Sequence, residues 1–578
     1  MDKEKIQLAL IVLLSVSLCV QPSSFSFIIE AENITLLPQS QYLAEQTDDN
    51  PPINQTATER YAQETLDYFI NPKLGLDEET GLVRNYIIDR DSYIEQAGYT
   101  SITDIGLQLA SISGAFKTGI LPGHEAKAMV EKIIDTLNIM EAYDASFGDF
   151  DGCRYYFNYY VLDTLTSDKK IISSIDNAWL ATGLIIARET FPELEEKISP
   201  IVDKMDFNLF YNPRRNLFRI GFLYNSDTDS LIDLSSLYNQ QATYKTMNSE
   251  TRMISYIAIG KGDISEKEIS EHLQKLDREL TEYNGIKVSR SFGGSVFEHG
   301  MPALFVNEAD LSPLGFGINL KKSLYIQMLQ AKELNYPIWG ESPSTDENYG
   351  YSTFGAHSGK DPYDSRGVIT PHASFLALEV LPYEAKQNLE NIALLFPEAY
   401  RENFGFADAI NINNNEVITK YLALDQGMTF IAALNSTSNG IIRDIFTNST
   451  EGKIIDNVLS DIAFFNQDKL IEEAEECYLL AGRRIDDGLW QTAEILLDYT
   501  VDLCQNHITT EIDLPSIEQY RIEIEGQKQL ALSSLYKEAE DLITQDNLLE
   551  AEIKIIQILV IDKNYLDALQ TLRQLQNR

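Results

Sequence analysis

Between residue 58 and about residue 435, segments with helical apolar spacing alternate with long connections, and this alternation constrains the fold more than any other feature. Apolar residues recur with a period near 3.6 in the segments 58–70, 102–116, 125–140, 174–188, 249–259, 266–282 and 320–334. The connections are rich in Gly, Asn, Tyr and Pro, and one of them, 207–220, has the pattern of a β-hairpin around Asn212-Pro213. The sequence therefore predicts an all-α domain whose elaborated loops build a cleft.

After about residue 465 the aromatic connections end and amphipathic segments follow one another directly. Helices are predicted at 470–483, 490–504, 517–545, 549–560 and 565–576. The spacing of Ala474, Tyr478 and Ala481 resembles that of tetratricopeptide-like helical hairpins, with about two irregular units visible. We expect a connector at 438–465 and a small helical-hairpin domain at 466–578, packed on the larger domain and able to bind a protein partner.

The N-terminal segment has the pattern of an export signal. Two lysines precede an apolar run of about fifteen residues, which is short for a membrane span and ends at Gln21-Pro22. We expect residues 1–26 to be a signal peptide or an N-terminal anchor, followed by a polar linker at 27–57. Either reading predicts a protein that is secreted, periplasmic or held on the outer face of the cell membrane.

Charge and cysteine usage exclude several classes of function. The net charge of −42 repels phosphate backbones, so a nucleic-acid partner is not expected, whereas a neutral oligosaccharide feels little of this repulsion. The cysteines after Cys19 show no metal-binding spacing, although Cys477 and Cys504 could pair. The segment 225–236 begins like a calcium loop but has Ser230 and Ser236 where such a loop needs Gly and Glu. The sequence thus predicts no metal site and no other cofactor.

Carboxylates stand among Gly, Ser, Asn and aromatic residues in several short motifs of the larger domain. They are Asp104, Asp176, Glu250, Glu298, Glu341, Asp408 and Asp425. A pair of carboxyl groups is what glycosidic-bond cleavage requires, and aromatic rings such as Trp179, Trp339, Tyr349 and Tyr351 can stack on sugar faces. Each carboxylate alone could equally be a helix cap or an ion-pair partner; Asp104, which follows Ser101, has the spacing of a cap.

Taken in order, the motifs resemble the glucoamylase-like domain family of endo-β-1,2-glucanases and cyclic β-1,2-glucan synthases. The matching segments lie at 101–107 (SITDIGL), 176–180 (DNAWL), 249–253 (SETRM), 293–302 (GGSVFEHGMP), 339–342 (WGES), 370–374 (TPHAS), 404–409 (FGFADA) and 425–428 (DQGM). The resemblance covers about residues 58–437. The sequence departs from the family at Trp339-Gly340-Glu341-Ser342, which is shortened, and at Asp176, where the glucanases carry Glu.

This resemblance implies an (α/α)6 toroid, a helical barrel, over 58–437. It also implies a glycoside hydrolase or transglycosylase acting on a β-glucan, above all a β-1,2-linked one. By the same resemblance Glu250 is the general acid and Asp176 lies in the substrate-binding or water-activating region. The implied substrate-binding residues are Asp104, Trp179, Arg252, Glu298, Trp339, Glu341, Asp408 and Asp425. The alternative is a catalytically silent, exported polysaccharide-binding or assembly protein.

Overall fold

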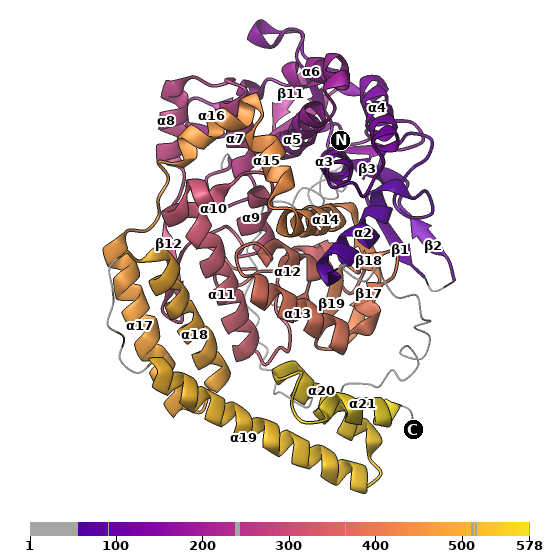
Figure 1. Cartoon of the computed structure of the whole chain (residues 1–578). Coiled ribbons are helices and arrows are strands. Elements are labelled where there is room, and N and C mark those ends of the chain that lie inside the picture. The colour runs from indigo at the N-terminus through magenta and orange to yellow at the C-terminus, as the bar shows by residue number, and fades with distance from the viewer. Residues whose placement is uncertain are drawn as a thin grey trace.

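The computed structural model describes residues 56–90, 92–236, 243–363, 366–509, 514 and 517–576. The predicted signal segment and all of the predicted linker except its last two residues lie outside this range. Thr56 caps the first described helix, α2 (Ala57–Ile70), through a bond to the backbone N–H of Glu59. The described chain is rich in helices, as predicted (Figure 1).

A set of buried helices forms the centre of the larger body. They are α3 (Ile102–Lys117), α5 (Ser174–Thr190), α7 (Arg252–Gly260), α9 (Val296–Gly300), α12 (Pro371–Ala377) and α14 (Ala423–Thr437). Helix α3 packs on α5 and α5 on α7, while α12 packs on both α9 and α14, and α14 returns to α3. These helices are buried on nearly every side, because other elements surround them.

Further helices cover the central set from outside. They are α2, α4 (Gly123–Ile139), α6 (Glu195–Asp203), α11 (Ile318–Glu333), α13 (Pro382–Leu395) and α16 (Thr450–Leu459). Helix α2 packs on α14, α4 on α3, and α6 on α5. Helix α11 packs on α9, α13 on α12, and α16 on α7. The predicted connector 438–465 therefore contains α15 (Ile441–Thr447), packed on α5, and α16, so it belongs to the packed body.

Two glycines allow α3 and α5 to approach unusually closely. A Cβ atom on Gly106 would lie 2.4 Å from the carbonyl oxygen of Trp179, and one on Gly183 would lie 2.1 Å from the carbonyl oxygen of Gly106. Such distances leave no room for any side chain. This contact brings the first turn of α3 against the first turn of α5, so that Thr103 Oγ1 donates to Asp176 Oδ1 at 2.6 Å.

Small antiparallel sheets, which the all-α prediction did not include, lie beside the N-terminal ends of the central helices. One has the order β2-β1-β21, formed by β1 (Tyr86–Asp89), β2 (Ile94–Gln96) and β21 (Lys420–Leu422). Strand β3 (Tyr99–Ser101) pairs with β6 (Tyr159–Val161). Because β3 runs directly into α3 and β21 into α14, these strands fix where those helices begin.

The other strands form further small sheets. Two are three-stranded: β7 (Ile171–Ser173), β10 (Gly221–Asn225) and β11 (Ser230–Asp233); and β16 (Val368–Ile369), β19 (Ala409–Asn411) and β20 (Glu416–Ile418). Two-stranded pairs join β4 (Ala142–Asp144) to β5 (Arg154–Tyr156), β14 (Ser344–Thr345) to β15 (Tyr351–Ser352), and β17 (Tyr400–Arg401) to β18 (Gly405–Phe406). The segment that begins like a calcium loop forms the turn between β10 and β11.

The predicted hairpin is present, but one predicted helix is too long. Strands β8 (Tyr211–Asn212) and β9 (Leu217–Phe218) pair around the Asn-Pro turn, although 207–210 forms a short 3-10 helix. The helix predicted at 266–282 ends at Lys275 as α8 (Glu266–Lys275). Its last part is β12 (Leu280–Tyr283), paired with β13 (Ile286–Ser289) through an Asn284-Gly285 turn with φ of 49° and 81°. The Asn-Gly pair, which favours this tight turn, outweighed the helical spacing.

The C-terminal helices divide into two groups, and the first of them does not separate from the larger body at the predicted boundary of 466. Helices α17 (Gln467–Asp486) and α18 (Trp490–Asp502) share one continuous apolar core with the larger body. At this contact Lys322 of α11 forms a fully buried ion pair with Glu473 at 2.7 Å, and Tyr499 donates to the same carboxylate at 2.5 Å. The second half of α19 (Ile517–Thr544) forms a separate core with α20 (Leu548–Ile561) and α21 (Ala568–Gln576), which lie below α13 in Figure 1.

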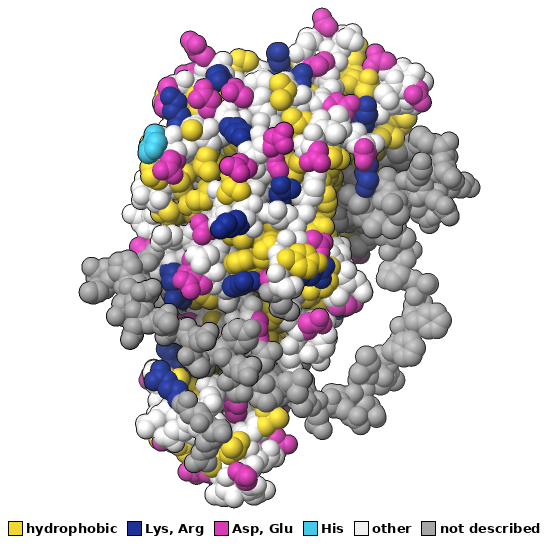
Figure 2. All heavy atoms as spheres, turned by 90° about the vertical axis from the view of Figure 1, so that its right-hand side faces the viewer, with side chains coloured by type: hydrophobic (Ala, Val, Ile, Leu, Met, Phe, Trp, Pro, Cys, Tyr) yellow, Lys and Arg dark blue, Asp and Glu magenta, His cyan; other side chains and the backbone are white. Residues whose placement is uncertain are grey.

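Three further observations concern the surface, the cysteines and the length of the apolar helices. On the face that Figure 2 shows, acidic and basic side chains are interspersed without a continuous basic patch. Cys153, Cys477 and Cys504 are free thiols, so the possible pairing of Cys477 with Cys504 does not occur. Among the described helices, none is both long and apolar enough to cross a membrane.

Candidate active site

A cavity of about 690 Å³ opens at the N-terminal ends of the central helices. Its volume lies within the range of roughly 300–1,000 Å³ that is typical of small-molecule sites. Its base includes residues from the first turns of α3 and α5 and the segment before α7, and its walls come from β1, β2, β3, β6, β21 and the turn before β15. Four of the site residues that the resemblance implies line it: Asp104, Asp176, Trp179 and Glu250. Two of the candidate stacking rings, Tyr349 and Tyr351, line it as well.

Asp104 is both a helix cap and part of the cavity lining. Its backbone N–H donates to Ser101 Oγ, and its carboxylate accepts from the Ser101 backbone N–H at 3.1 Å, which completes a capping box at the start of α3. The Asn85 side chain donates to the same carboxylate oxygen at 2.7 Å. Burial raises the pKa of Asp104 to about 7. The cap interpretation and the site interpretation of this residue are therefore compatible.

Asp176 occupies the equivalent position on α5, three residues after the cap Ser173. Its carboxylate accepts from Thr103 Oγ1, and the side-chain nitrogen of Asn158, when it faces this group, donates to both oxygens at 3.1 and 3.2 Å. Burial raises the pKa of Asp176, while the hydrogen bonds from Ser173 and Thr103 lower it. These donors stabilise the ionised form that water activation requires.

Glu250 lies just before α7 and is only 2% exposed. Oε2 accepts from Ser249 Oγ at 2.7 Å, whereas Oε1 has no hydrogen-bond partner within the described chain. Burial and the nearby carboxylate of Glu298 raise the pKa of Glu250 to about 8. A buried carboxyl group with one unpaired oxygen at a cavity is a candidate proton donor to a ligand.

Asp408 and Asp425 lie outside the cavity lining, although the prediction placed them in it. Both are buried, and Asp408 Oδ2 accepts from the Thr345 backbone N–H at 2.6 Å. Burial and the neighbouring Asp425 raise the pKa of Asp408 well above its ordinary value, and burial raises that of Asp425 to about 7. His372 Nδ1 lies 3.2 Å from Asp425 Oδ2, and burial lowers the pKa of this histidine to about 4. The two carboxyl groups thus share a buried pocket of polar groups next to the cavity.

Arg252 and Glu298 also do not line the cavity, because local contacts engage both side chains. Arg252 forms a buried ion pair with Glu308 at 2.6 Å and donates to the backbone carbonyls of Ser249, Glu298 and His299. Glu298 accepts from the backbone N–H groups of residues 292, 293 and 295. These side chains hold the loops beneath Glu250 in place.

Trp339 and Glu341 are placed similarly, away from the cavity lining. Trp339 is buried, and its backbone N–H and carbonyl both bond to the Asn388 side chain. The carboxylate of Glu341 accepts from Gln330. The segment 339–342 (WGES), which departs from the family's pattern, therefore packs in the interior.

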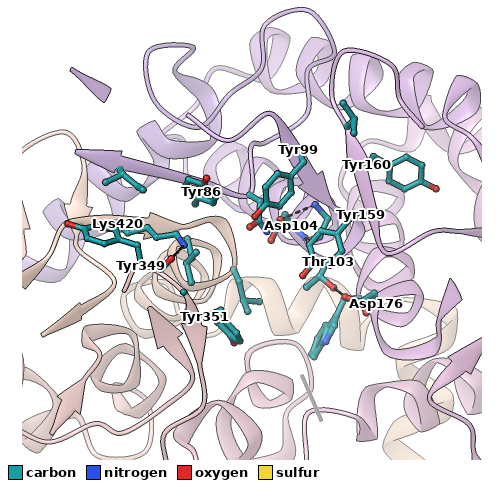
Figure 3. A pocket seen from close by; sticks show the side chains of 18 of the residues that line it. Tyr86, Tyr99, Thr103, Asp104, Tyr159, Tyr160, Asp176, Tyr349, Tyr351 and Lys420 are labelled. Carbon is teal, nitrogen blue, oxygen red and sulfur yellow. Dashed lines mark hydrogen bonds between the residues drawn. The ribbon is translucent and has the colours of Figure 1, made fainter. Parts of the chain in front are cut away.

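Sequence reasoning missed a row of tyrosines and a lysine that line the cavity: Tyr86, Tyr99, Tyr159 and Lys420. The ring centroids of Tyr86 and Tyr99 are 5.9 Å apart, as are those of Tyr99 and Tyr159 (Figure 3). The tyrosine-rich stretch 155–160 was the only sequence signal for part of this wall. In the described part of the chain, no cluster of three His, Cys, Asp or Glu residues is arranged to hold a metal ion.

Comparison with known proteins agrees with the resemblance in the sequence. Residues 243–450 match the family model described as "Putative glucoamylase". The cyclic β-(1,2)-glucan synthase NdvB of Rhizobium meliloti (strain 1021) is 29% identical over 277 residues, which is 45% of this chain and 9% of that protein. The chain thus spans less than a tenth of this relative's length. These matches confirm the predicted resemblance for the larger body; the tetratricopeptide-like character of the C-terminal helices stays a prediction.

Solved structures extend the comparison to most of the larger body. A structure described as a putative glucoamylase from Bacteroides fragilis aligns with a TM-score of 0.58 at 15% identity, covering 71% of this chain and 99% of that one. The endo-β-1,2-glucanase of Chitinophaga pinensis, solved with sophorotriose and glucose, aligns with a TM-score of 0.57 at 15% identity, covering 70% and 98%. At this level of identity the likeness establishes a shared fold.

Proposed function

We propose that this protein is a glycoside hydrolase or transglycosylase that acts on a β-1,2-linked glucan. One observation carries the proposal: Glu250 is a buried carboxyl group with a raised pKa and an unpaired oxygen, in a cavity that Asp176 also lines. The relatives support the choice of substrate, since they include a cyclic β-(1,2)-glucan synthase and an endo-β-1,2-glucanase.

Glu250 is proposed as the general acid. With a pKa of about 8 it keeps its proton near neutral pH, and Oε1 is free to face the glycosidic oxygen. Donating this proton allows the leaving sugar to depart as a neutral alcohol. The resulting Glu250 carboxylate is reprotonated before the next cycle.

Asp176 is proposed as the group that activates the attacking water or acceptor hydroxyl. Its hydrogen bonds from Thr103 and Ser173 favour the ionised form against the effect of burial. The carboxylate takes a proton from the nucleophile as that oxygen bonds to the anomeric carbon. Asp104 and Trp179, which line the same cavity, are proposed to contact the sugar.

The finer features of the architecture belong to the same proposal. We infer an (α/α)6 toroid, in which the central helices form the inner ring and the covering helices the outer one. Two runs of neighbouring helices support it: α3 packs on α5 and α5 on α7, while α9 packs on α12, α12 on α14 and α14 on α3. Helix α16 extends this unit past the predicted boundary at 437. We further propose that the protein is exported, and that the helices from α17 onward, tetratricopeptide-like in spacing, bind a protein partner.

The test compares two variants on two substrates. Glu250→Gln should reduce the rate on β-1,2-glucan roughly 10²-fold or more, because it removes the proton that the poor leaving group needs. The same variant should lose far less on an aryl glycoside with an activated leaving group. Asp176→Asn should impair both substrates, since nucleophilic attack is common to them.

The outcomes separate the proposal from its alternative. Small, equal losses in both variants on both substrates would contradict the assigned roles. Tight glucan binding by the wild-type protein without new reducing ends or transfer products would instead favour the silent polysaccharide-binding protein.

A further inference from the structure

One end of the cavity, away from Asp176, has features that the proposed chemistry does not use. Figure 3 shows Lys420, Tyr349 and Tyr86 on one side and Thr103 and Asp176 on the other, with Tyr99 and Asp104 between them. The cavity is larger than a single hexose ring requires. A chain of sugars that reached Glu250 and Asp176 could therefore extend to Lys420.

Lys420 is a buried cation whose donors are only partly used. It is 6% exposed and lines the cavity, and its Nζ donates to the Tyr349 carbonyl at 2.8 Å. The ammonium also lies 4.4 Å from the centre of the Tyr86 ring. Within the described residues it forms no salt bridge, although an ammonium carries three N–H donors and is costly to bury without partners. The remaining donor capacity is available to a ligand in the cavity.

The surrounding wall is held rigidly. Tyr349 has a left-handed backbone with φ of 61°, which is strained for a residue of its size. The turn is fixed by Asp346, whose Oδ1 accepts from the backbone N–H groups of Asn348 and Gly350 at 2.9 and 3.0 Å. The Arg90 guanidinium lies 4.7 Å from the centre of the Tyr349 ring and pairs with Glu95 at 3.0 Å. Strain that the surroundings maintain in this way is typical of a binding site.

The neighbouring tyrosines continue this wall toward the carboxylates. Tyr86, Tyr99 and Tyr159 contact one another edge to face in sequence. Apolar ring surface combined with phenol and ammonium donors is the chemistry that recognises the faces and hydroxyl groups of a neutral sugar. The carboxylates in the cavity make an anionic ligand unfavourable.

We propose that Lys420, Tyr86 and Tyr349 form a remote sugar-binding subsite, which makes the protein select glucans long enough to span from this subsite to Glu250 and Asp176. The inference rests on the proposed function for its substrate class. It adds that affinity depends on chain length and that Lys420 donates to a hydroxyl oxygen of the distal sugar.

The experiment measures binding, so that it does not depend on turnover. The probes are β-1,2-linked glucan oligosaccharides of increasing length, beginning with the disaccharide, titrated calorimetrically into the Glu250→Gln protein and into the same protein with Lys420→Met. Loss of a charged hydrogen bond should weaken binding of the longer oligosaccharides roughly 10-fold or more and leave the disaccharide, which can occupy the carboxylate end alone, nearly unchanged. Lys420→Arg, which keeps the cation, should recover part of the loss.

A second variant keeps the test independent of folding. Tyr86→Leu removes the ring beneath the ammonium and should give the same length-dependent loss, with the thermal midpoint of every variant recorded. Equal weakening for all lengths in folded variants, or none at any length, would overturn the inference. If the wild-type protein shows no hydrolysis or transfer but binding depends on length and on Lys420, the proposed reaction fails and the subsite stands.

Discussion

The raised pKa of Glu250 predicts that this residue destabilises the protein as the pH rises. Its pKa is raised from 4.5 to about 8 by burial and by Glu298. Because the folded value exceeds the unfolded one, the native state binds more protons than the unfolded state between these pH values, and the free energy of unfolding falls as the pH rises through them. Each pKa unit corresponds to about 1.4 kcal/mol. Because the group titrates only partly at each end of the range, the contribution of Glu250 falls by roughly 3–4 kcal/mol between about pH 5 and about pH 8.

Glu250→Gln removes this titration while it keeps the size of the side chain. The variant should therefore gain roughly 3–4 kcal/mol of unfolding free energy relative to the wild type between about pH 5 and about pH 8. The other buried carboxyl groups, such as Asp104 and Asp425, titrate in both proteins and cancel in this difference. Urea-unfolding curves of both proteins across the pH range measure it, with Glu475→Gln on the exposed face of α17 as the control. A difference that does not change with pH would refute the assignment of Glu250 as a protonated acid.

Two further predictions concern the packing that builds the site. Gly106→Ala should destabilise the protein by roughly 1–3 kcal/mol and lower its activity, because the new Cβ would displace α3 from α5 and disturb the contact to Asp176. Gly526→Ala is the matched control, since no atom lies within 4 Å of the new Cβ, and it should be neutral or stabilising in thermal unfolding. Glu473→Gln should cost roughly 3–5 kcal/mol in urea unfolding, because it leaves Lys322 buried without its partner, whereas combining Glu473→Leu with Lys322→Met should restore most of that stability. If the double variant were no more stable than Glu473→Gln, the ion pair would not be what couples α17 to the larger body.

Local sequence patterns predicted most of the helices because their information is local. The segments 102–116 and 174–188 became α3 and α5 nearly unchanged, since apolar spacing and the caps Ser101 and Ser173 specify where such helices begin. The small sheets were missed because their strands are short and pair with distant residues, as β1 does with β21. Packing of the C-terminal helices on the larger domain was expected, but not the residues that form the contact, because no local signal reveals that Glu473 meets Lys322.

The candidate site shows the same division. The motifs placed Asp104, Asp176 and Glu250 among ten candidates, and Asp104 and Asp176 lie in the first turns of α3 and α5, at the helix ends that border the cavity. The sequence could not distinguish them from Glu298 or Glu341, which have equally suggestive neighbours but are engaged by local donors. Nor could it place Lys420 against Tyr86, which lies more than three hundred residues earlier in the chain.

The sequence by itself determined the positions of the helices, the acidic character of the chain and the carboxylates available for chemistry, because period, charge and residue type are properties of the chain. Only the tertiary structure decided which carboxylates face the cavity and which of them hold a proton. Both depend on burial and on neighbours remote in sequence. Thr103 reaches Asp176 because two glycines let α3 and α5 pack closely. The pKa of Glu250 is raised to about 8 because folding buries this carboxyl group and places it near Glu298.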